Sequence, residues 1–242
     1  MHTHHVVNGQ EVVQLLFIIG FSVLAVLYIG AVLFTNRKLK KWPMHRTIYW
    51  CLGLVCAALA VAGPLANRAH EDFAVHMIGH LLLGMLAPLF LVLAAPMTLL
   101  LRTLSTKSAR LLTKLLKSSL ARIVTDPVVA TILNMGGLWL LYTTELSTLM
   151  HDNSVVSFFI HVHILLAGYL FTISMIYIDP VFHRKSFLYR AIVLIFALAS
   201  HGILAKYLYM HPPSGVAIEQ AQQGSMVMYY GGDLVDAVII FI

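Results

Sequence analysis

Seven long apolar runs, separated by short polar segments, are the main feature of the chain. They fall at about 12–34, 47–65, 75–101, 127–144, 155–178, 188–210 and 225–242. A helix needs roughly 20 mainly apolar residues to cross the ~30 Å hydrocarbon core of a bilayer, and each run is close to that length. The pattern therefore predicts seven transmembrane helices. The first run is too long for a signal-peptide core and has no small-residue cleavage site, so we expect it to remain in the protein.

The composition supports this assignment and excludes several other classes of protein. Of the 242 residues, 60% are hydrophobic and 11% are charged, and only two are cysteines. A typical soluble domain is ~45–50% apolar and ~25% charged, so a soluble enzyme, a disordered chain and a disulfide scaffold are all excluded. Seven helices use about 150 residues, which leaves too few for a separate soluble domain. The predicted fold class is an all-α polytopic membrane protein with a single domain over residues 1–242.

The basic residues predict the orientation of the helices. Fourteen of the sixteen Lys and Arg residues lie in 35–46, in 102–126 and in the stretch that follows the fifth run. Because cytoplasmic loops carry an excess of Lys and Arg, we place these segments in the cytoplasm. The amino terminus is then outside and the carboxyl terminus is cytoplasmic. The net charge of +6 thus reflects topology, and it does not indicate a nucleic-acid partner.

One of these basic segments is amphipathic. At about 102–122, leucines at near-helical spacing are opposed by Arg110, Lys114 and Lys117. This pattern is typical of a helix that lies in the plane of the membrane at the lipid surface, although a surface for docking a partner protein has the same pattern.

The thirteen histidines are distributed unevenly across the predicted membrane. Only His45 and His183 belong to cytoplasmic segments, and the other eleven lie outside or in the outer halves of helices. Ionisable groups inside a membrane helix are costly, so they mark a functional site or a paired group. The outer half of the bundle is therefore the predicted site.

Four of these histidines can occupy one region of that outer half. His76 and His80 are four residues apart and share a helix face. At 1.5 Å per residue, His80 and His161 lie ~8 Å and ~9 Å below the outer ends of their helices, and His201 lies ~13 Å down. His163 points about 160° away from His161, and Gly168 permits close helix packing on the face of His161, so we leave His163 out.

Asp233 in the seventh run lies at a comparable depth, ~12 Å. It could be a metal ligand or the carboxylate that orients a ligating imidazole. It could equally form an intramembrane ion pair with Lys206. The sequence leaves these alternatives open.

The chemistry of this set favours a transition metal. Imidazole suits copper, zinc and iron, and thioether sulfur selects copper in its reduced state. Five methionines fall in the outer half of the predicted bundle: Met77, Met150, Met210, Met226 and Met228. The candidate ligands are His76, His80, His161, His201 and Asp233. The amino-terminal His2, His4 and His5 could collect metal from outside.

Several stretches of the chain resemble a known family. The third run reads HMIGHLLLGMLAP from His76 to Pro88, Asp126-Pro127 opens the fourth, and His161 is followed by Gly168 and Phe171. Ser200-His201-Gly202 and the stretch from Gln223 to Asp233 complete the pattern. These stretches resemble the signatures of the CtaG-type cytochrome c oxidase assembly factors, the multi-helix membrane family of bacteria. Two positions depart from the family pattern, because Pro88 is followed by Leu89 and Thr172 stands where tryptophan is usual.

The resemblance implies a role in the maturation of haem–copper oxidases, in copper insertion at the oxidase. By position, the matched polar residues are His76, His80, His161, His201 and Asp233. The implied partners are oxidase subunits, the lipid bilayer and a copper donor on the outer side, and the implied location is the bacterial cytoplasmic (inner) membrane. No turnover is implied, so we do not expect an enzyme.

Two other functions remain open from the sequence alone. An intramembrane zinc-dependent hydrolase would use His80, His161 and His201 as ligands and Asp233 as a base. The chain has no HExxH motif, which weighs against this reading. A haem-binding membrane cytochrome would instead use two histidines from different helices as axial ligands.

Overall fold

A computed structural model describes residues 9–69 and 71–242, and the described residues form helices, turns and loops with no strand. Five long helices are uninterrupted: α1 (Gly9–Lys38), α2 (Met44–Val61), α12 (Ser154–Met175), α13 (Phe187–Met210) and α14 (Ile218–Phe241). Two further rods each contain a π-helical turn: α4 (Phe73–Leu81), η1 (Leu82–Leu86) and α5 (Ala87–Leu93), then α9 (Pro127–Thr131), η2 (Ile132–Gly136) and α10 (Gly137–Thr143). The short helices are α3 (Pro64–Arg68), α6 (Pro96–Thr103), α7 (Thr106–Leu116), α8 (Ser119–Val124) and α11 (Leu146–Asp152).

The helical rods have the length and surface expected of a multi-pass membrane protein. Six helices in the described part of the chain are long and apolar enough to cross a bilayer, whereas the rod from Pro127 to Thr143 is shorter. Large apolar side chains such as Leu15, Val26 and Phe196 are exposed on the outside of the bundle. In water this surface would be unfavourable, but hydrocarbon chains solvate it well. The predicted all-α membrane class is confirmed, and each of the seven apolar runs is helical.

The third predicted helix is shorter than the run of apolar residues suggests. We expected one helix over about 75–101, but the helix ends at Leu93 and α6 begins at Pro96. Between them, Ala95 takes a left-handed conformation with φ 51°. Proline has no N–H with which to continue a helix and disfavours the helical conformation in the residue before it, so Pro96 explains the break.

The last helix and the amphipathic segment also differ from the predictions. The last helix begins at Ile218, seven residues before the apolar run does. The amphipathic segment predicted at about 102–122 is divided among the end of α6, α7 and α8. Ser105 caps α7 and Ser118 caps α8, each accepting a backbone N–H. These caps start α7 and α8 at defined residues.

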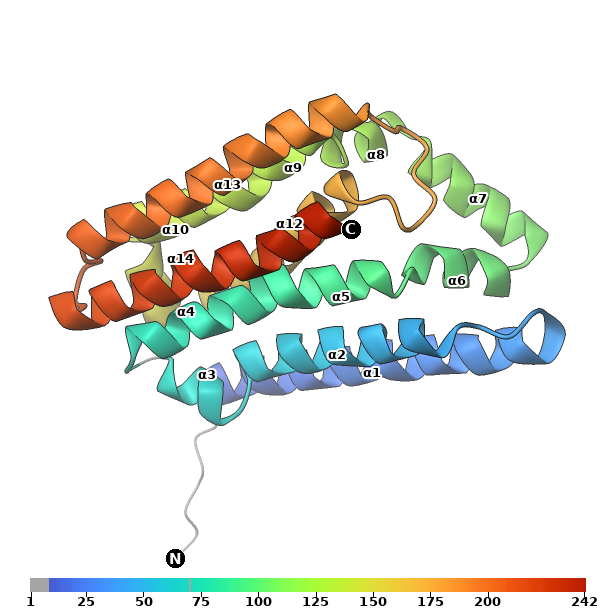
Figure 1. Cartoon of the computed structure of the whole chain (residues 1–242). Coiled ribbons are helices and arrows are strands. Elements are labelled where there is room, and N and C mark those ends of the chain that lie inside the picture. Colours follow the sequence, from blue (N-terminus) through green and yellow to red (C-terminus); the bar gives the residue numbers. More distant parts are fainter. Residues whose placement is uncertain (1–8, 70) are drawn as a thin grey trace, which may run out of the picture.

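The helices form one bundle with two different ends (Figure 1). At one end α1, α4, α12 and α14 begin, and α2, α10 and α13 finish. The opposite end carries α6, α7 and α8 and the loops that hold most of the Lys and Arg residues. We call the first the histidine end and the second the basic end.

One close contact fixes the position of α12 within the bundle. A Cβ atom at Gly168 would overlap the carbonyl oxygen of Gly84 in η1, so only glycine permits this approach. The carbonyl of Gly84 also lacks its usual helical hydrogen bond, because the residue four positions later is Pro88, which has no N–H. The π-helical turn is where the helix accommodates this proline. The close approach that Gly168 was predicted to permit is thus confirmed.

At the basic end, polar contacts join the loops to the rods. Asp126 pairs with Lys185 at 2.7 Å and accepts a hydrogen bond from the hydroxyl of Tyr189. Burial alone would raise the pKa of Asp126, but the contacts with Lys185 and the Val128 N–H outweigh it and lower the pKa. The carboxylate of Asp179 accepts hydrogen bonds from the N–H groups of Met97 and Thr98 and so caps α6.

The glycine contact makes a prediction about stability. Gly168→Ala should lower the stability of the detergent-purified protein by about 1–3 kcal/mol, because the added methyl group must push α12 away from η1. Gly20→Ala is the matched control, since nothing lies within 4 Å of a Cβ atom at that position. A thermal-unfolding scan of both variants measures the difference. Equal midpoints would mean that the contact at Gly168 does not constrain the bundle.

Candidate functional site

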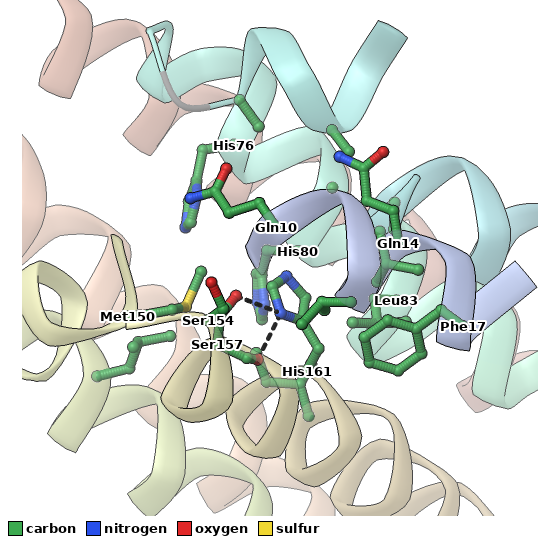
Figure 2. Close-up of a pocket in the computed structure, with 18 of the residues that line it drawn as sticks. Gln10, Gln14, Phe17, His76, His80, Leu83, Met150, Ser154, Ser157 and His161 are labelled. Atoms are coloured by element: carbon green, nitrogen blue, oxygen red, sulfur yellow. Dashed lines mark hydrogen bonds between the residues drawn. The ribbon is translucent and has the colours of Figure 1, made fainter. Parts of the chain in front are cut away.

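A small cavity of about 60 Å³, lined by both apolar and polar residues, lies at the histidine end of the bundle (Figure 2). Its walls come from α1, α2, α3, α4, η1, α10, α11 and α12. The polar residues that line it are Gln10, Gln14, His76, His80, Tyr142, Ser154, Ser157 and His161. Three of the four predicted histidines therefore share one cavity.

His76 lies at the outer edge of this cavity. The carboxylate of Asp72 accepts hydrogen bonds from the N–H groups of Ala74 and Val75, which starts α4 at a defined residue. One turn later, Nε2 of His76 is 3.1 Å from the hydroxyl of Tyr142 on α10. The ring of His76 also stacks on Phe73, with ring centroids 5.8 Å apart. These contacts hold the imidazole across the gap between α4 and α10.

His80 lies one turn deeper and pairs with His201 of α13. Both side chains are buried, with 6% and 3% of their surfaces exposed, and their ring centroids are 6.3 Å apart. Neither ring nitrogen of His80 has a hydrogen-bond partner among the described residues, and Nε2 of His201 has none either. A Cβ atom at Gly232 of α14 would overlap the ring of His201, so this glycine makes room for the imidazole.

His161 reaches the same cavity from α12. Its Nδ1 is 2.7 Å from the carbonyl oxygen of Ser157 and 3.4 Å from the hydroxyl of that residue. We assign the proton to Nδ1, because a carbonyl oxygen can only accept a hydrogen bond. The lone pair of the neutral ring is then on Nε2. The backbone of α12 therefore sets the tautomer that a metal ligand would need.

His163 lies on a different face of α12, as predicted. It is exposed, and its Nε2 donates to the carbonyl oxygen of Leu133, 3.2 Å away in η2. A Cβ atom at Gly137 would lie 2.6 Å from the same nitrogen, so the glycine admits the ring. His163 therefore links α12 to the π-helical turn of the fourth rod and does not join the cavity.

Asp233 does not face the cavity. Its side chain is exposed, and it follows Gly232, which contacts His201. The predicted alternative, an ion pair with Lys206, is not formed among the residues that the structure describes. Lys206 instead lies over the ring of Tyr229, 5.3 Å from its centroid. The buried carboxyl group on this helix is that of Asp236, with 5% of its surface exposed.

Sequence reasoning missed several polar residues of the cavity. Tyr142 contacts His76, and Ser157 holds His161. Gln10 and Gln14 of α1 also line the cavity, and neither was among the predicted site residues. A tyrosine near the outer end of the fourth run was the available signal, since a buried hydroxyl group needs a partner. The amino-terminal His2, His4 and His5 lie outside the described residues.

The described histidines do not form a closed metal cage. No group of three or more His, Cys, Asp or Glu residues in the described ranges has the spacing to hold an ion. The arrangement consists of a buried imidazole pair, His80 and His201, beside a cavity that His76 and His161 also line. Fully buried Met77 lies on the same helix as His80, and buried Met150 lines the cavity. The thioether of Met150 and the imidazoles of His76, His80 and His161 thus line one cavity.

Comparison with known proteins identifies the family. The model of the cytochrome c oxidase caa3 assembly factors (Caa3_CtaG) matches residues 26–242. The chain belongs to this family. The match includes α4, α12, α13 and α14, and so covers every predicted ligand.

Related proteins come from mycobacteria. An uncharacterized protein of Mycobacterium leprae is 32% identical over 183 residues, which are 73% of this chain and 28% of that protein. An uncharacterized protein of Mycobacterium tuberculosis is 34% identical over 167 residues, or 65% of this chain and 25% of the relative. The matched region is thus about a quarter of the length of these relatives. No solved structure matches the chain.

The unpartnered imidazole of His80 makes a prediction about stability without metal. His80→Leu should raise the stability of the metal-free protein by about 1–3 kcal/mol, because it removes two buried nitrogens that lack hydrogen bonds. His163→Leu is the matched substitution with the opposite expectation, since it removes the hydrogen bond to Leu133. Thermal unfolding in detergent with a metal chelator gives both values. If His80→Leu unfolds at a lower temperature than the unmodified protein, the ring nitrogens of His80 do have hydrogen-bond partners in the metal-free state.

Proposed function

We propose that the protein binds Cu(I) at the histidine end of the bundle and helps to insert it into a haem–copper cytochrome c oxidase. The observation that carries the proposal is the buried pair His80 and His201: both ring nitrogens of His80 and Nε2 of His201 lack hydrogen-bond partners in the described part of the chain. Copper is the cargo in this account. The membership of the chain in an oxidase assembly family supplies the context.

The donor set fits a soft monovalent ion. Imidazole nitrogen and thioether sulfur both bind Cu(I), and neither adds a negative charge to the membrane interior. His76, His80, His161 and His201 are the proposed ligands, and Met77 and Met150 are the nearby thioethers. Asp233 is proposed as an outer carboxylate that interacts electrostatically with His201 from the surface of α14. This role is an indirect one, in agreement with its exposed position.

The proposed orientation places this site near the outer face of a bacterial cytoplasmic membrane. We take the rod from Pro127 to Thr143 as a seventh, short span, which puts the amino terminus outside and the carboxyl terminus inside. The basic end then faces the cytoplasm, as the distribution of Lys and Arg in membrane proteins favours. The cavity at the histidine end would receive copper from a donor on the outer side.

Delivery of copper requires a site that can also release it. A cavity open at one end of the bundle, with ligands on three different helices, suits exchange better than a closed cage of the structural kind. The exposed apolar flanks of the helices would pack against oxidase subunits in the same membrane. The role is that of an assembly factor, and no catalytic turnover is part of it. The family match lends no support to a zinc hydrolase or a haem cytochrome.

The proposed ligands make a prediction about copper affinity. The double variant His80→Ala, His201→Ala should bind Cu(I) more than about 100-fold more weakly than the unmodified protein, since loss of ligands costs more than loss of the groups that orient them. Titration of the detergent-purified protein with Cu(I) against a competing chelator measures this. The matched control is His45→Ala, His183→Ala, which removes two histidines from the basic end. If the two double variants bind copper equally well, the site is elsewhere.

The proposed role also makes a prediction in cells. A bacterium that lacks the gene should lose cytochrome c oxidase activity when copper is scarce, because the oxidase then depends on assisted insertion. The unmodified gene should restore activity, and the gene for the control variant should restore it too. Normal oxidase activity in the deletion strain under copper limitation would exclude the assembly role.

A further inference from the structure

A second, larger cavity lies at the basic end of the bundle, opposite the histidine end. Its volume is about 520 Å³, and it lies between the end of α12, the start of α13 and the end of α14. The walls are mostly apolar and include Met175, Ile178, Leu194, Leu198 and Ile239. This volume falls within the ~300–1,000 Å³ typical of ligand pockets.

The cavity can be reached from the lipid. Phe187, Ile195 and Ile240 belong to its lining and are also exposed on the surface of the bundle. An apolar cavity that opens sideways into hydrocarbon at the end of a membrane helix has the shape and the chemistry to take an acyl chain. Side chains from three helices would contact that chain along its length.

One cation, Arg190, lies in the wall of this cavity. Its guanidinium group donates to the carbonyl oxygen of Met175 and lies over the ring of Tyr177, 4.4 Å from the centroid. Nε of Arg190 is buried and has no hydrogen-bond partner among the described residues. The ion pair that the described residues do form, Lys185 with Asp126, does not include it. Among the described residues, no carboxylate therefore pairs with this positive charge.

A second guanidinium group lies beside the first. Arg184 is exposed and lies over the same Tyr177 ring, 5.7 Å from its centroid. Two arginines thus lie around one aromatic residue of the cavity wall. Arginine suits phosphate because its planar fork of donors can form two parallel, charge-assisted hydrogen bonds.

We propose that this cavity binds one anionic phospholipid, with an acyl chain between α12, α13 and α14 and the headgroup phosphate on Arg190 and Arg184. Basic pockets between membrane helices on the cytoplasmic side are known to bind anionic headgroups. The apolar walls, the lateral opening and the unbalanced charge each fit this ligand. The site is separate from the proposed copper site and does not depend on it.

The test is native mass spectrometry of the full chain in detergent, with phosphatidylglycerol or phosphatidylcholine added at equal concentrations. We expect phosphatidylglycerol to bind at a ratio of one and more tightly than phosphatidylcholine. Arg190→Gln and Arg184→Gln should each weaken phosphatidylglycerol binding about fivefold, the effect of one basic side chain near an anionic headgroup. Arg190→Lys, which keeps the charge, should retain part of the preference.

A second pair of variants tests the place of the acyl chain. Ala191→Phe should fill part of the cavity and weaken binding of both lipids, whereas Ala199→Phe, on an exposed position of the same helix, should leave binding unchanged. Equal binding of the two lipids by the unmodified protein would overturn the proposal, and so would unchanged binding by Ala191→Phe. Arg184 is exposed, so its variant tests the headgroup contact even if a substitution in the wall prevents folding.

Discussion

The close contact between α12 and the π-helical turn η1 sets the geometry on which the site depends. Gly168 and Gly84 approach so closely that no side chain fits between them. His80 precedes Gly84 by one helical turn, and His161 precedes Gly168 by two. Since α4 and α12 both begin at the same end of the bundle, both histidines lie on the same side of this contact and on facing surfaces. One backbone contact thus brings two imidazoles to one cavity.

The second constraint is the free energy of burying polar groups in a membrane. An imidazole nitrogen without a hydrogen bond loses its interactions with water and gains nothing in return. The bundle nevertheless buries both ring nitrogens of His80 and Nε2 of His201 without a hydrogen bond among the described residues, while His163 at the surface donates to a backbone carbonyl. Proteins keep buried polar groups that destabilise the fold mainly at functional sites. Binding of a metal ion would supply the missing partner for these nitrogens.

The sequence predicted the helices well, because the length of an apolar run follows directly from the thickness of a bilayer. It did not predict the break at Ala95. There a residue in the left-handed conformation and the proline after it interrupt the helix, although the apolar run continues. It also missed the first turns of α14, which are helical but polar, since hydropathy does not detect a helix that extends into water. The π-helical turns have no side-chain pattern of their own.

The sequence predicted those features of the site that depend on the spacing of residues along a single helix. The four-residue spacing of His76 and His80 correctly placed both at one cavity, and the angle between His161 and His163 correctly separated those two. Depth alone could not show which way Asp233 faces, because residues at one depth can lie anywhere around a helix. Tyr142 and Ser157 were missed because they act through partners on other helices or through the backbone.

The most direct measurement is the copper-to-haem ratio of the cytochrome c oxidase purified from copper-limited cells. Cells whose only copy of the gene carries His80→Ala and His201→Ala should yield an oxidase with its full haem content and a reduced amount of copper. Cells with the unmodified gene should yield an oxidase with both. If the ratio is the same in the two preparations, the buried histidines do not supply copper to the oxidase, and the central claim fails.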